Sequence, residues 1–136
     1  DLNQNAGTIV QDRTIYEDAE IFATNLYRQG NMEKREYQNY MDLYTGMSRT
    51  LQPPDLMIYL RCSVRAIRRR IQKRGRASEQ QIPTPYLRGL NQLYESWMES
   101  YDLSPKLVWD SERLDYLSHL VDRLEFRKML KPFLNP

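Results

Sequence analysis

A carboxylate stands beside a guanidinium near the start of this chain, in the string Asp12-Arg13-Thr14. Residues 7–13 (GTIVQDR) are predicted as a short buried strand that runs into this polar end. Ligands of open parallel sheets bind beyond the carboxyl ends of the strands, so polar residues at this position are candidates for a site. Pairs of this kind are also common in purely structural roles, and the string needs support from elsewhere in the chain.

A second group of candidates is basic. When residues 63–74 are placed on a helix, Arg70 and Arg74 lie one turn apart at the edge of its apolar stripe. Arg76 follows immediately after Gly75, so three arginines are expected on one side of a turn. This arrangement suits a polyphosphate, because guanidinium groups match phosphate oxygens in geometry and charge.

Two other interpretations of the basic stretch stay open. A solvated basic face is the one we favour for Arg65 and Arg69, which point away from the apolar stripe. A nucleic-acid patch is the other, and it is disfavoured because the run is short, the net charge is only +2 and no glycine-aromatic RNA-binding string is present.

Asp18 and Phe22 are the third pair of candidates. They lie four residues apart on a helix predicted over 16–29 and therefore share a face. A carboxylate that accepts hydrogen bonds beside a ring that can stack could recognise a nucleobase. The apolar spacing alone favours Phe22 as a core residue, so both interpretations stay open.

Strands and helices that alternate along the chain would position these residues. The alternation predicts a parallel α/β sheet with right-handed crossovers. Strands are predicted over 7–13, 55–60 and 106–110, with helices over 16–29, 31–51, 63–74, about 83–101 and 116–130. Asn31 is the expected N-cap of the second helix.

Two aromatic patterns accompany these elements. Tyr37, Tyr40, Tyr44, Met47 and Leu51 recur at alternating spacings of three and four residues, which marks packing against another helix, in the same chain or in a partner. A second stripe in the helix over about 83–101 is predicted to be core: Tyr94, Trp97 and Tyr101.

Composition narrows the class of protein. The chain has 136 residues, 40% hydrophobic and 28% charged, which fits one globular domain. With a net charge of +2 and no apolar run near the ~20 residues of a membrane helix, we expect neither nucleic acid nor a membrane as partner. The single cysteine, Cys62, cannot form an internal disulfide and is predicted to be a packing residue, which fits the cytoplasm.

Three strings together resemble the deoxynucleoside kinase family, in particular bacterial deoxyadenosine/deoxyguanosine kinases. They are QDRTIYEDAEIFATNLY over 11–27, RIQKRGRASEQQIPTPYL over 70–87 and LYESW over 93–97. Their order and spacing fit the family along essentially the whole chain. A random globular protein could carry one of these strings, but not all three.

The resemblance implies roles for the first two groups of candidates. Asp12 would help to place Mg²⁺, and Arg13 would hold phosphate and orient the catalytic carboxylate; both are thus catalytic candidates. Thr14 stands where the family usually has serine, and it keeps the hydroxyl. Asp18 would read the edge of the base, and Phe22 would stack on it.

The resemblance also implies a lid over about 70–82. Glu79 would bind the 3′-hydroxyl of the sugar, while Ser78 replaces a second acidic residue that the family often has there. The residues that would contact ATP are Arg70, Arg74, Arg76, Asp115 and Tyr116.

The implied activity is ATP-dependent 5′-phosphorylation of deoxynucleosides, with a purine base expected, in nucleotide salvage. ATP and Mg²⁺ would be the cofactors, and the enzyme would be a homodimer built on helices around 16–51. Two alternatives stay open: a thymidylate-like nucleoside-monophosphate kinase, and a non-catalytic helical dimerisation module.

One expected motif is missing. A P-loop kinase needs GxxxxGK(S/T) to hold phosphates, and none of the five glycines lies in such a string. The family's catalytic glutamate is missing as well. We therefore expect an incomplete P-loop-kinase-like parallel sheet flanked by helices, without its first two strands, in which residues 1–136 are the carboxyl-terminal part of a single domain. Residues 1–136 alone are predicted to be inactive, and the missing strand would leave a gap at the centre of the sheet.

Overall fold

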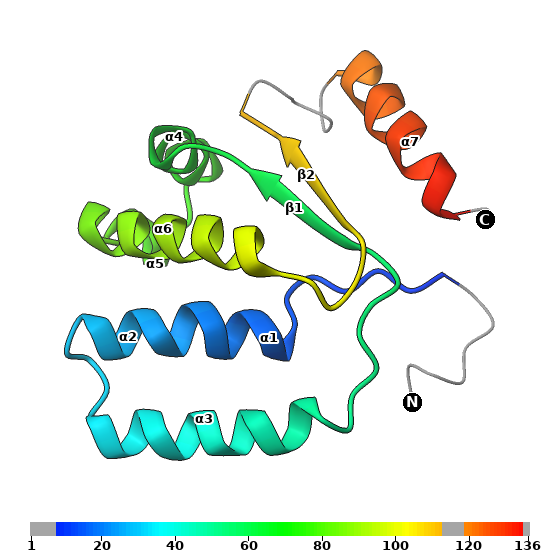
Figure 1. Cartoon of the computed structure of the whole chain (residues 1–136). Coiled ribbons are helices and arrows are strands. Elements are labelled where there is room, and N and C mark those ends of the chain that lie inside the picture. Colours follow the sequence, from blue (N-terminus) through cyan, green and yellow to red (C-terminus); the bar gives the residue numbers. More distant parts are fainter. Residues whose placement is uncertain (1–7, 113–118, 135–136) are drawn as a thin grey trace.

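The computed structural model of the chain describes residues 8–112 and 119–134. Figure 1 shows a small parallel sheet with α7 on one side and the other helices on the other side. The elements are α1 (Ile15–Glu17), η2 (Asp18–Ala23), α2 (Thr24–Arg28), α3 (Lys34–Ser48), β1 (Met57–Arg61), α4 (Val64–Arg74), α5 (Ala77–Gln80), α6 (Thr84–Ser100), β2 (Lys106–Asp110) and α7 (Leu120–Leu134).

The sheet has two parallel strands within the described part of the chain. β1 pairs with β2 in the register Met57↔Lys106 to Arg61↔Asp110, and α4, α5 and α6 make the crossover between them. This confirms the predicted strand–helix–strand unit. Leu60 of β1 and Val108 of β2 are 41% and 45% exposed, so the sheet is incompletely covered.

The strand predicted over 7–13 does not form in the described residues 8–13, which are irregular. A strand is stabilised by hydrogen bonds to a neighbour, and this segment pairs with neither strand of the described sheet. Val10 is accordingly 90% exposed. The prediction was wrong for this reason: apolar residues suit a strand but do not supply its partner.

The helical stretch 15–28 is the centre of the core. It lies between α3 and α6, and it packs against both (Figure 1). Its buried side chains include Tyr16, Ala19 and Ile21, and the facing helix α6 contributes the buried Leu93 and Met98. The first strand-end candidates, residues 12–14, lead directly into this central helix.

Local capping explains where the other helices begin and end. Ser63 accepts a hydrogen bond from the Ala66 amide (3.2 Å) at the start of α4, as predicted for an N-cap, and Gly75 (φ 70°) ends that helix in the left-handed conformation. Asn31 is not the N-cap of α3. Glu33 takes that position, and its amide donates to Glu36 Oε2 at 2.9 Å.

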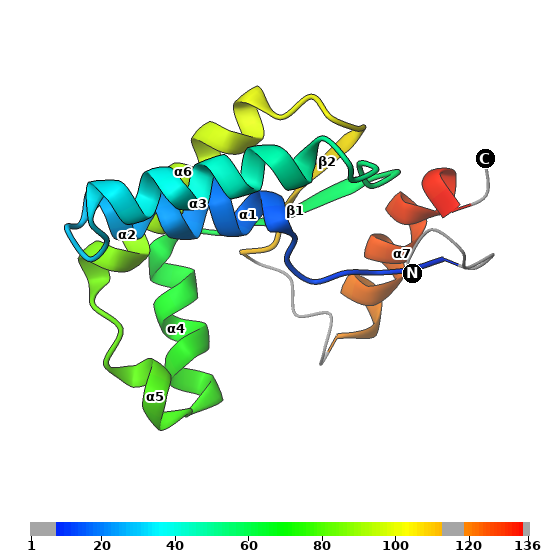
Figure 2. The same cartoon turned by 90° about the horizontal axis from the view of Figure 1, so that it is seen from below.

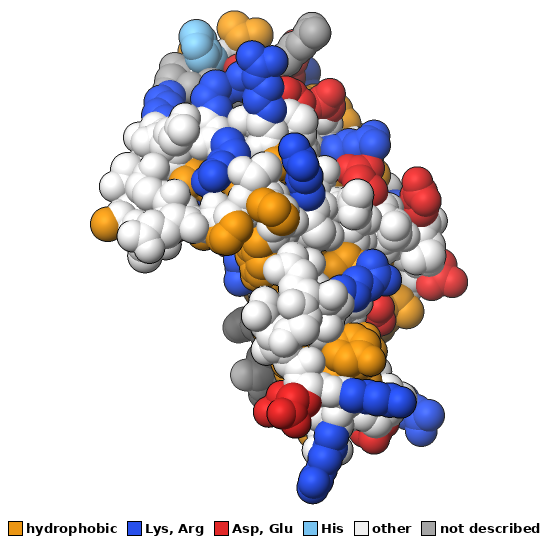
Figure 3. Space-filling view, turned by 90° about the vertical axis from the view of Figure 1, so that its left-hand side faces the viewer, with side chains coloured by type: hydrophobic (Ala, Val, Ile, Leu, Met, Phe, Trp, Pro, Cys, Tyr) orange, Lys and Arg blue, Asp and Glu red, His pale blue; other side chains and the backbone are white. Residues whose placement is uncertain are grey.

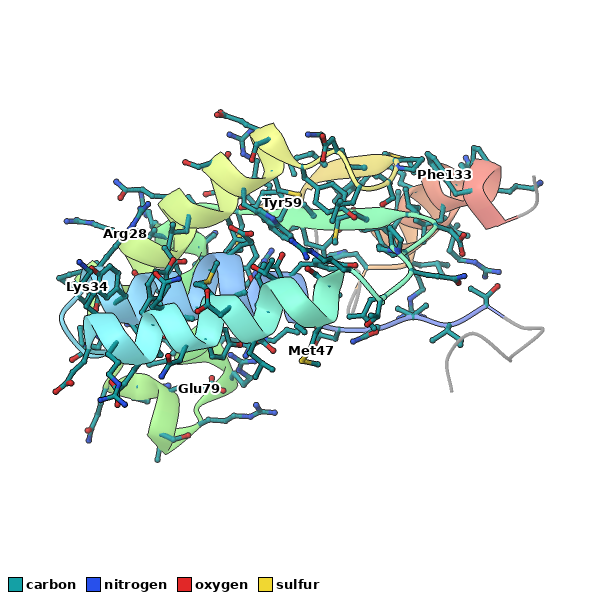
Figure 4. All side chains as sticks on the ribbon, turned by 60° about the horizontal axis from the view of Figure 1, so that its bottom comes forward. Arg28, Lys34, Met47, Tyr59, Glu79 and Phe133 are labelled. Atoms are coloured by element: carbon teal, nitrogen blue, oxygen red, sulfur yellow. The ribbon has the colours of Figure 1, made fainter. Side chains whose placement is uncertain are left out.

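The tyrosines of α3 pack within their own chain. Tyr37 stacks on Tyr27 with ring centres 4.4 Å apart, and Tyr44 meets Tyr16 edge-on at 6.4 Å. The last two residues of the same pattern are exposed. Met47 and Leu51 are 45% and 44% exposed, and Figure 4 shows Met47 pointing away from the other helices.

The second aromatic stripe is only partly core. Tyr101 is 5% exposed and meets Trp97 edge-on at 5.4 Å, in line with the prediction. Tyr94 is half-buried and lines a pocket instead. None of the described helices is long and apolar enough to cross a membrane.

Candidate functional site

A pocket of about 360 Å³ lies between the turn before α1, the β1 strand and α6. It brings together residues that are as far apart in the sequence as Asp12 and Tyr94. Its lining residues are Asp12, Arg13, Glu17, Phe22, Ile58, Tyr59, Leu60, Cys62, Ile67, Leu87, Leu90, Asn91 and Tyr94. Three of the predicted site residues, Asp12, Arg13 and Phe22, are therefore at one place.

Arg13 and Phe22 are in direct contact. The Arg13 guanidinium carbon lies 4.3 Å from the centre of the Phe22 ring, which is cation–π geometry. Arg13 also has φ 66°, a left-handed conformation that costs a residue with a side chain about 1–2 kcal/mol. Backbone strain of this kind collects at functional sites, where the surrounding structure holds it.

Phe22 enters the pocket from a π-helical segment, η2. The Thr24 hydroxyl donates to the Ala19 carbonyl, five residues earlier, at 3.0 Å. Such π-turns inside α-helices are frequent at functional sites. Asp18 begins the same segment but is exposed and does not line the pocket. Burial, together with the Asp18 carboxylate, raises the pKa of Tyr40 on α3.

The lid arginines divide into two groups. Arg74 and Arg76 both pair with Glu79, at 2.7 and 3.2 Å, because Gly75 reverses the chain and α5 then folds back. Arg70 instead reaches the end of β2, where it donates to Ser111 Oγ (3.3 Å) and to the Ser111 carbonyl. The expected convergence of three arginines thus holds for two of them.

The lid projects from the body of the molecule. Figure 2 shows α5 and the end of α4 standing away from the other helices, and Figure 4 shows Glu79 well apart from Tyr59. Glu79 does not line the pocket. Arg65 and Arg69 are exposed, as expected for a solvated face, and the blue side chains in Figure 3 stand among white, orange and red ones without merging into one patch.

The sequence interpretation missed the polar and aromatic groups opposite Arg13. Tyr94 stacks on Tyr59 with ring centres 5.6 Å apart, and the Tyr94 hydroxyl donates to Glu17 Oε1 at 3.1 Å. Burial raises the pKa of both phenols, and the Glu17 carboxylate adds to the effect on Tyr94. Glu17 and Tyr94 both lie inside strings that resemble the family, directly before Asp18 and Glu95, but nothing in these strings indicates that the two residues meet.

Cys62 also lines the pocket. Burial raises the pKa of its thiol, and this disfavours the thiolate that a nucleophile needs. This agrees with its interpretation as a packing residue. Asp115 and Tyr116, predicted to contact ATP, lie outside the described residues.

No cluster of three or more acidic, histidine or cysteine ligands that could hold a metal occurs within 8–112 and 119–134. Mg²⁺ differs from most metals in this respect, because it is commonly held by one or two carboxylates together with substrate phosphates and water. The exposed Asp12 carboxylate on the pocket lining fits that donor set as a single ligand.

The fold and the pocket define a parallel α/β protein whose polar turn lies against a sheet and its crossover helix. The family model described as deoxynucleoside kinase matches residues 1–134, and the chain belongs to that family. The predicted family and the predicted fold class, an incomplete P-loop-kinase-like sheet, are thereby confirmed.

Individual relatives agree. The chain is 37% identical over 114 residues to a deoxyadenosine/deoxycytidine kinase of Bacillus subtilis (strain 168), covering 82% of this chain and 52% of the relative. It is 37% identical over 125 residues to a deoxyguanosine kinase of Lactobacillus johnsonii, covering 85% and 55%. The structure of the deoxyadenosine kinase from M. mycoides with bound dATP matches with TM-score 0.74 and 34% identity, covering 94% of this chain and 66% of that one.

The chain spans about half the length of the curated relatives that it matches.

Proposed function

We propose that the protein carrying residues 1–136 transfers the γ-phosphate of ATP to the 5′-hydroxyl of a deoxynucleoside, and that these residues are the carboxyl-terminal part of its kinase domain. The observation that carries the proposal is the pocket in which Asp12, Arg13 and Phe22 meet, in a chain of this family. The phosphate cradle and the base that accepts the hydroxyl proton are placed in the part of the domain that these residues do not supply.

The assigned roles follow from the chemistry of phosphoryl transfer. Negative charge spreads over the transferring oxygens, so positioning and cationic stabilisation provide most of the catalysis. Arg13 would hold phosphate, and Asp12 would hold Mg²⁺, which neutralises phosphate charge when bound. The lid over 70–82 would contribute Arg70, Arg74 and Arg76 to ATP, and Asp115 and Tyr116 would contact its adenine.

The acceptor would be a deoxynucleoside with a purine base. Phe22 would stack on the base, Asp18 would read its edge, and Glu79 would bind the 3′-hydroxyl. The names of the relatives support deoxyadenosine and deoxyguanosine, and several of them also name deoxycytidine. Because Asp18 and Glu79 lie outside the pocket lining, both would have to meet the substrate after a rearrangement or at the pocket margin.

A homodimer through the helices around 16–51 is part of the proposal. Its support is the exposed apolar side chains on α3 and directly after it: Leu43, Met47 and Leu51 are 62%, 45% and 44% exposed. Replacing Leu43 by Glu should convert a dimer to a monomer in sedimentation, whereas Leu120→Glu on the exposed start of α7 should not. The single cysteine in the sequence supports a reducing compartment, the cytoplasm.

The test uses the full-length protein, with ATP and each of the four deoxynucleosides, and measures the 5′-monophosphate formed. Purine deoxynucleosides should be phosphorylated fastest, and residues 1–136 alone should be inactive. Phe22→Ala should raise the nucleoside KM about 5- to 150-fold, because stacking on an aromatic side chain contributes about 1–3 kcal/mol per base. Phe133→Ala is the matched control, since this ring is 44% exposed on α7, away from the pocket (Figure 4). Absence of product with all four nucleosides would refute the proposal.

A further inference from the structure

Glu17 connects two distant parts of the chain, because it contacts Tyr94, which is 77 residues away in the sequence. Its Oε2 accepts a hydrogen bond from the Thr14 amide at 2.9 Å and lies 3.5 Å from the Thr14 hydroxyl. Its Oε1 accepts a hydrogen bond from the Tyr94 hydroxyl on α6 at 3.1 Å. Both carboxylate oxygens are thus engaged, one by the turn that carries the site residues and one by the opposite wall of the pocket.

The turn that Glu17 holds is the strained one. Arg13, directly before Thr14, has φ 66°, which costs about 1–2 kcal/mol for a residue other than glycine. A hydrogen bond from an amide at a helix start to a carboxylate contributes about 1 kcal/mol. The two magnitudes are comparable, so the Glu17 contact is large enough to decide whether the turn keeps this conformation.

Tyr94 is itself held firmly. Its ring stacks on Tyr59 with an angle of 6° between the planes, and it meets the Phe22 ring edge-on at 6.4 Å. Tyr59 in turn donates to Glu95 Oε1 at 3.1 Å, and Glu95 pairs with Arg61 of the same strand. The hydroxyl that Glu17 accepts from is therefore fixed by β1 and α6 together.

We propose that Glu17 and Tyr94 are positioning residues: the Tyr94 hydroxyl orients the Glu17 carboxylate, which holds the Asp12–Arg13 turn so that Arg13 stays over Phe22. The inference rests on the proposed function, because the turn is held for phosphoryl transfer. It differs from a role for Glu17 as the proton acceptor. Both Glu17 oxygens already accept hydrogen bonds within the protein, from the Thr14 amide and the Tyr94 hydroxyl, which supports a role in holding the turn.

The kinetic test compares Tyr94→Phe, Glu17→Gln and Glu17→Ala in the full-length protein, with Tyr86→Phe on the same helix as control. Tyr94→Phe keeps the stacked ring and removes only the hydroxyl. We expect kcat to fall about tenfold, with the nucleoside KM within about threefold of wild type, because misplacement of about 1 Å can cost up to about 100-fold in rate. Tyr86→Phe should leave both constants unchanged.

A double-mutant cycle separates this role from a general packing defect. Since Tyr94 is proposed to act only through Glu17, Tyr94→Phe should have no further effect on kcat in the Glu17→Ala background. The pH dependence of kcat should keep its shape in Glu17→Gln. A kcat within twofold of wild type in Tyr94→Phe would overturn the proposal, as would additive losses in the cycle. Loss of the acidic limb of the pH profile would also overturn it, by assigning Glu17 as the base.

A readout without activity distinguishes failure of this inference from failure of the proposed function. The Thr14 amide should exchange its hydrogen about tenfold faster in Glu17→Ala and in Tyr94→Phe than in wild type, while amides of α3 are unchanged. Unchanged Thr14 exchange in both variants would overturn the inference. A wild-type protein that phosphorylates no deoxynucleoside, with Thr14 exchange raised in the variants, would refute the kinase proposal and leave the structural role of Glu17 supported.

Discussion

The guanidinium of Arg13 lies 4.3 Å from the centre of the Phe22 ring, although the two residues belong to different elements, an irregular turn and a π-helical segment. Arg13 makes this contact from a left-handed backbone conformation, with φ 66°. A residue proposed to hold phosphate and a ring proposed to stack on a base thus share one wall of the pocket.

At the left-handed position of Arg13, glycine should give a more stable protein than alanine, the reverse of their usual order within a helix. Arg13→Gly should be more stable than Arg13→Ala by about 1 kcal/mol, because both lose the guanidinium but only glycine adopts positive φ without steric cost. Urea unfolding of the two variants measures the difference. The same pair of substitutions at Gln38, exposed within α3, should show alanine as the more stable residue. If alanine were the more stable residue at both positions, the prediction would be contradicted.

Gly89 allows α6 to approach the central helix closely. A Cβ at this position would overlap the Asn25 side-chain oxygen, and Asn25 is only 1% exposed, so it has no room to move aside. Gly89→Ala should therefore destabilise the protein by about 1–3 kcal/mol, the usual cost of overpacking. Gly46→Ala on α3 meets nothing within 4 Å and should stabilise by about 0.5–1 kcal/mol. Thermal unfolding compares the two; a stabilising Gly89→Ala would show that α6 can shift.

Tyr44 should make stability depend on alkaline pH. Burial, followed by the charge and hydrogen bond of Glu20, raises the pKa of Tyr44 from 10.0 to about 12. The fold therefore favours the neutral phenol, and the stability that this contributes is complete below pH 10 and is lost between pH 10 and about 12. In urea unfolding across that range, Tyr44→Phe should lose less stability than wild type. Parallel losses in the two proteins would rule out this linkage.

Glu79 provides a test of sugar recognition that rests on the proposed function. In the full-length protein, Glu79→Ala should weaken binding of nucleosides with a 3′-hydroxyl far more than binding of 3′-deoxy analogues. Ser78→Ala, next to it, is the control. Glu79→Ala should change the free energy of unfolding by less than about 1 kcal/mol, because its partner Arg74 is 52% exposed and exposed ion pairs contribute little. Equal losses for both kinds of nucleoside would exclude the role.

The local elements of the crossover were predictable from the sequence. Ser63 and Gly75 bound α4 as an N-cap and a left-handed C-terminal residue do, and the strand expected over 106–110 is β2. These features depend on residues within a few positions of one another, which is why spacing and capping rules reach them. The family followed from three strings for the same reason, since each string is local.

Predictions that depended on contacts between residues far apart in the sequence succeeded less well. Residues 8–13 are no strand, because a strand depends on a neighbour and this segment pairs with neither strand of the described sheet. Arg70 bonds to Ser111 and not to the turn that holds Arg74 and Arg76, because the end of β2 lies beside that face of α4. Helical spacing gives the face on which a side chain lies, and it does not give the group that meets that face.

The sequence by itself determined the family, the strand–helix–strand unit of β1 and β2, and the residue types that can bind phosphate and a base. Only the tertiary structure decided that Arg13 lies over Phe22 and that Glu17 receives the Tyr94 hydroxyl. Local propensity acts over one turn of helix, whereas Glu17 and Tyr94 are 77 residues apart and meet because the helix 15–28 packs on α6. Their contact is a property of the packed core, which fixes the turn of the candidate site from its far side.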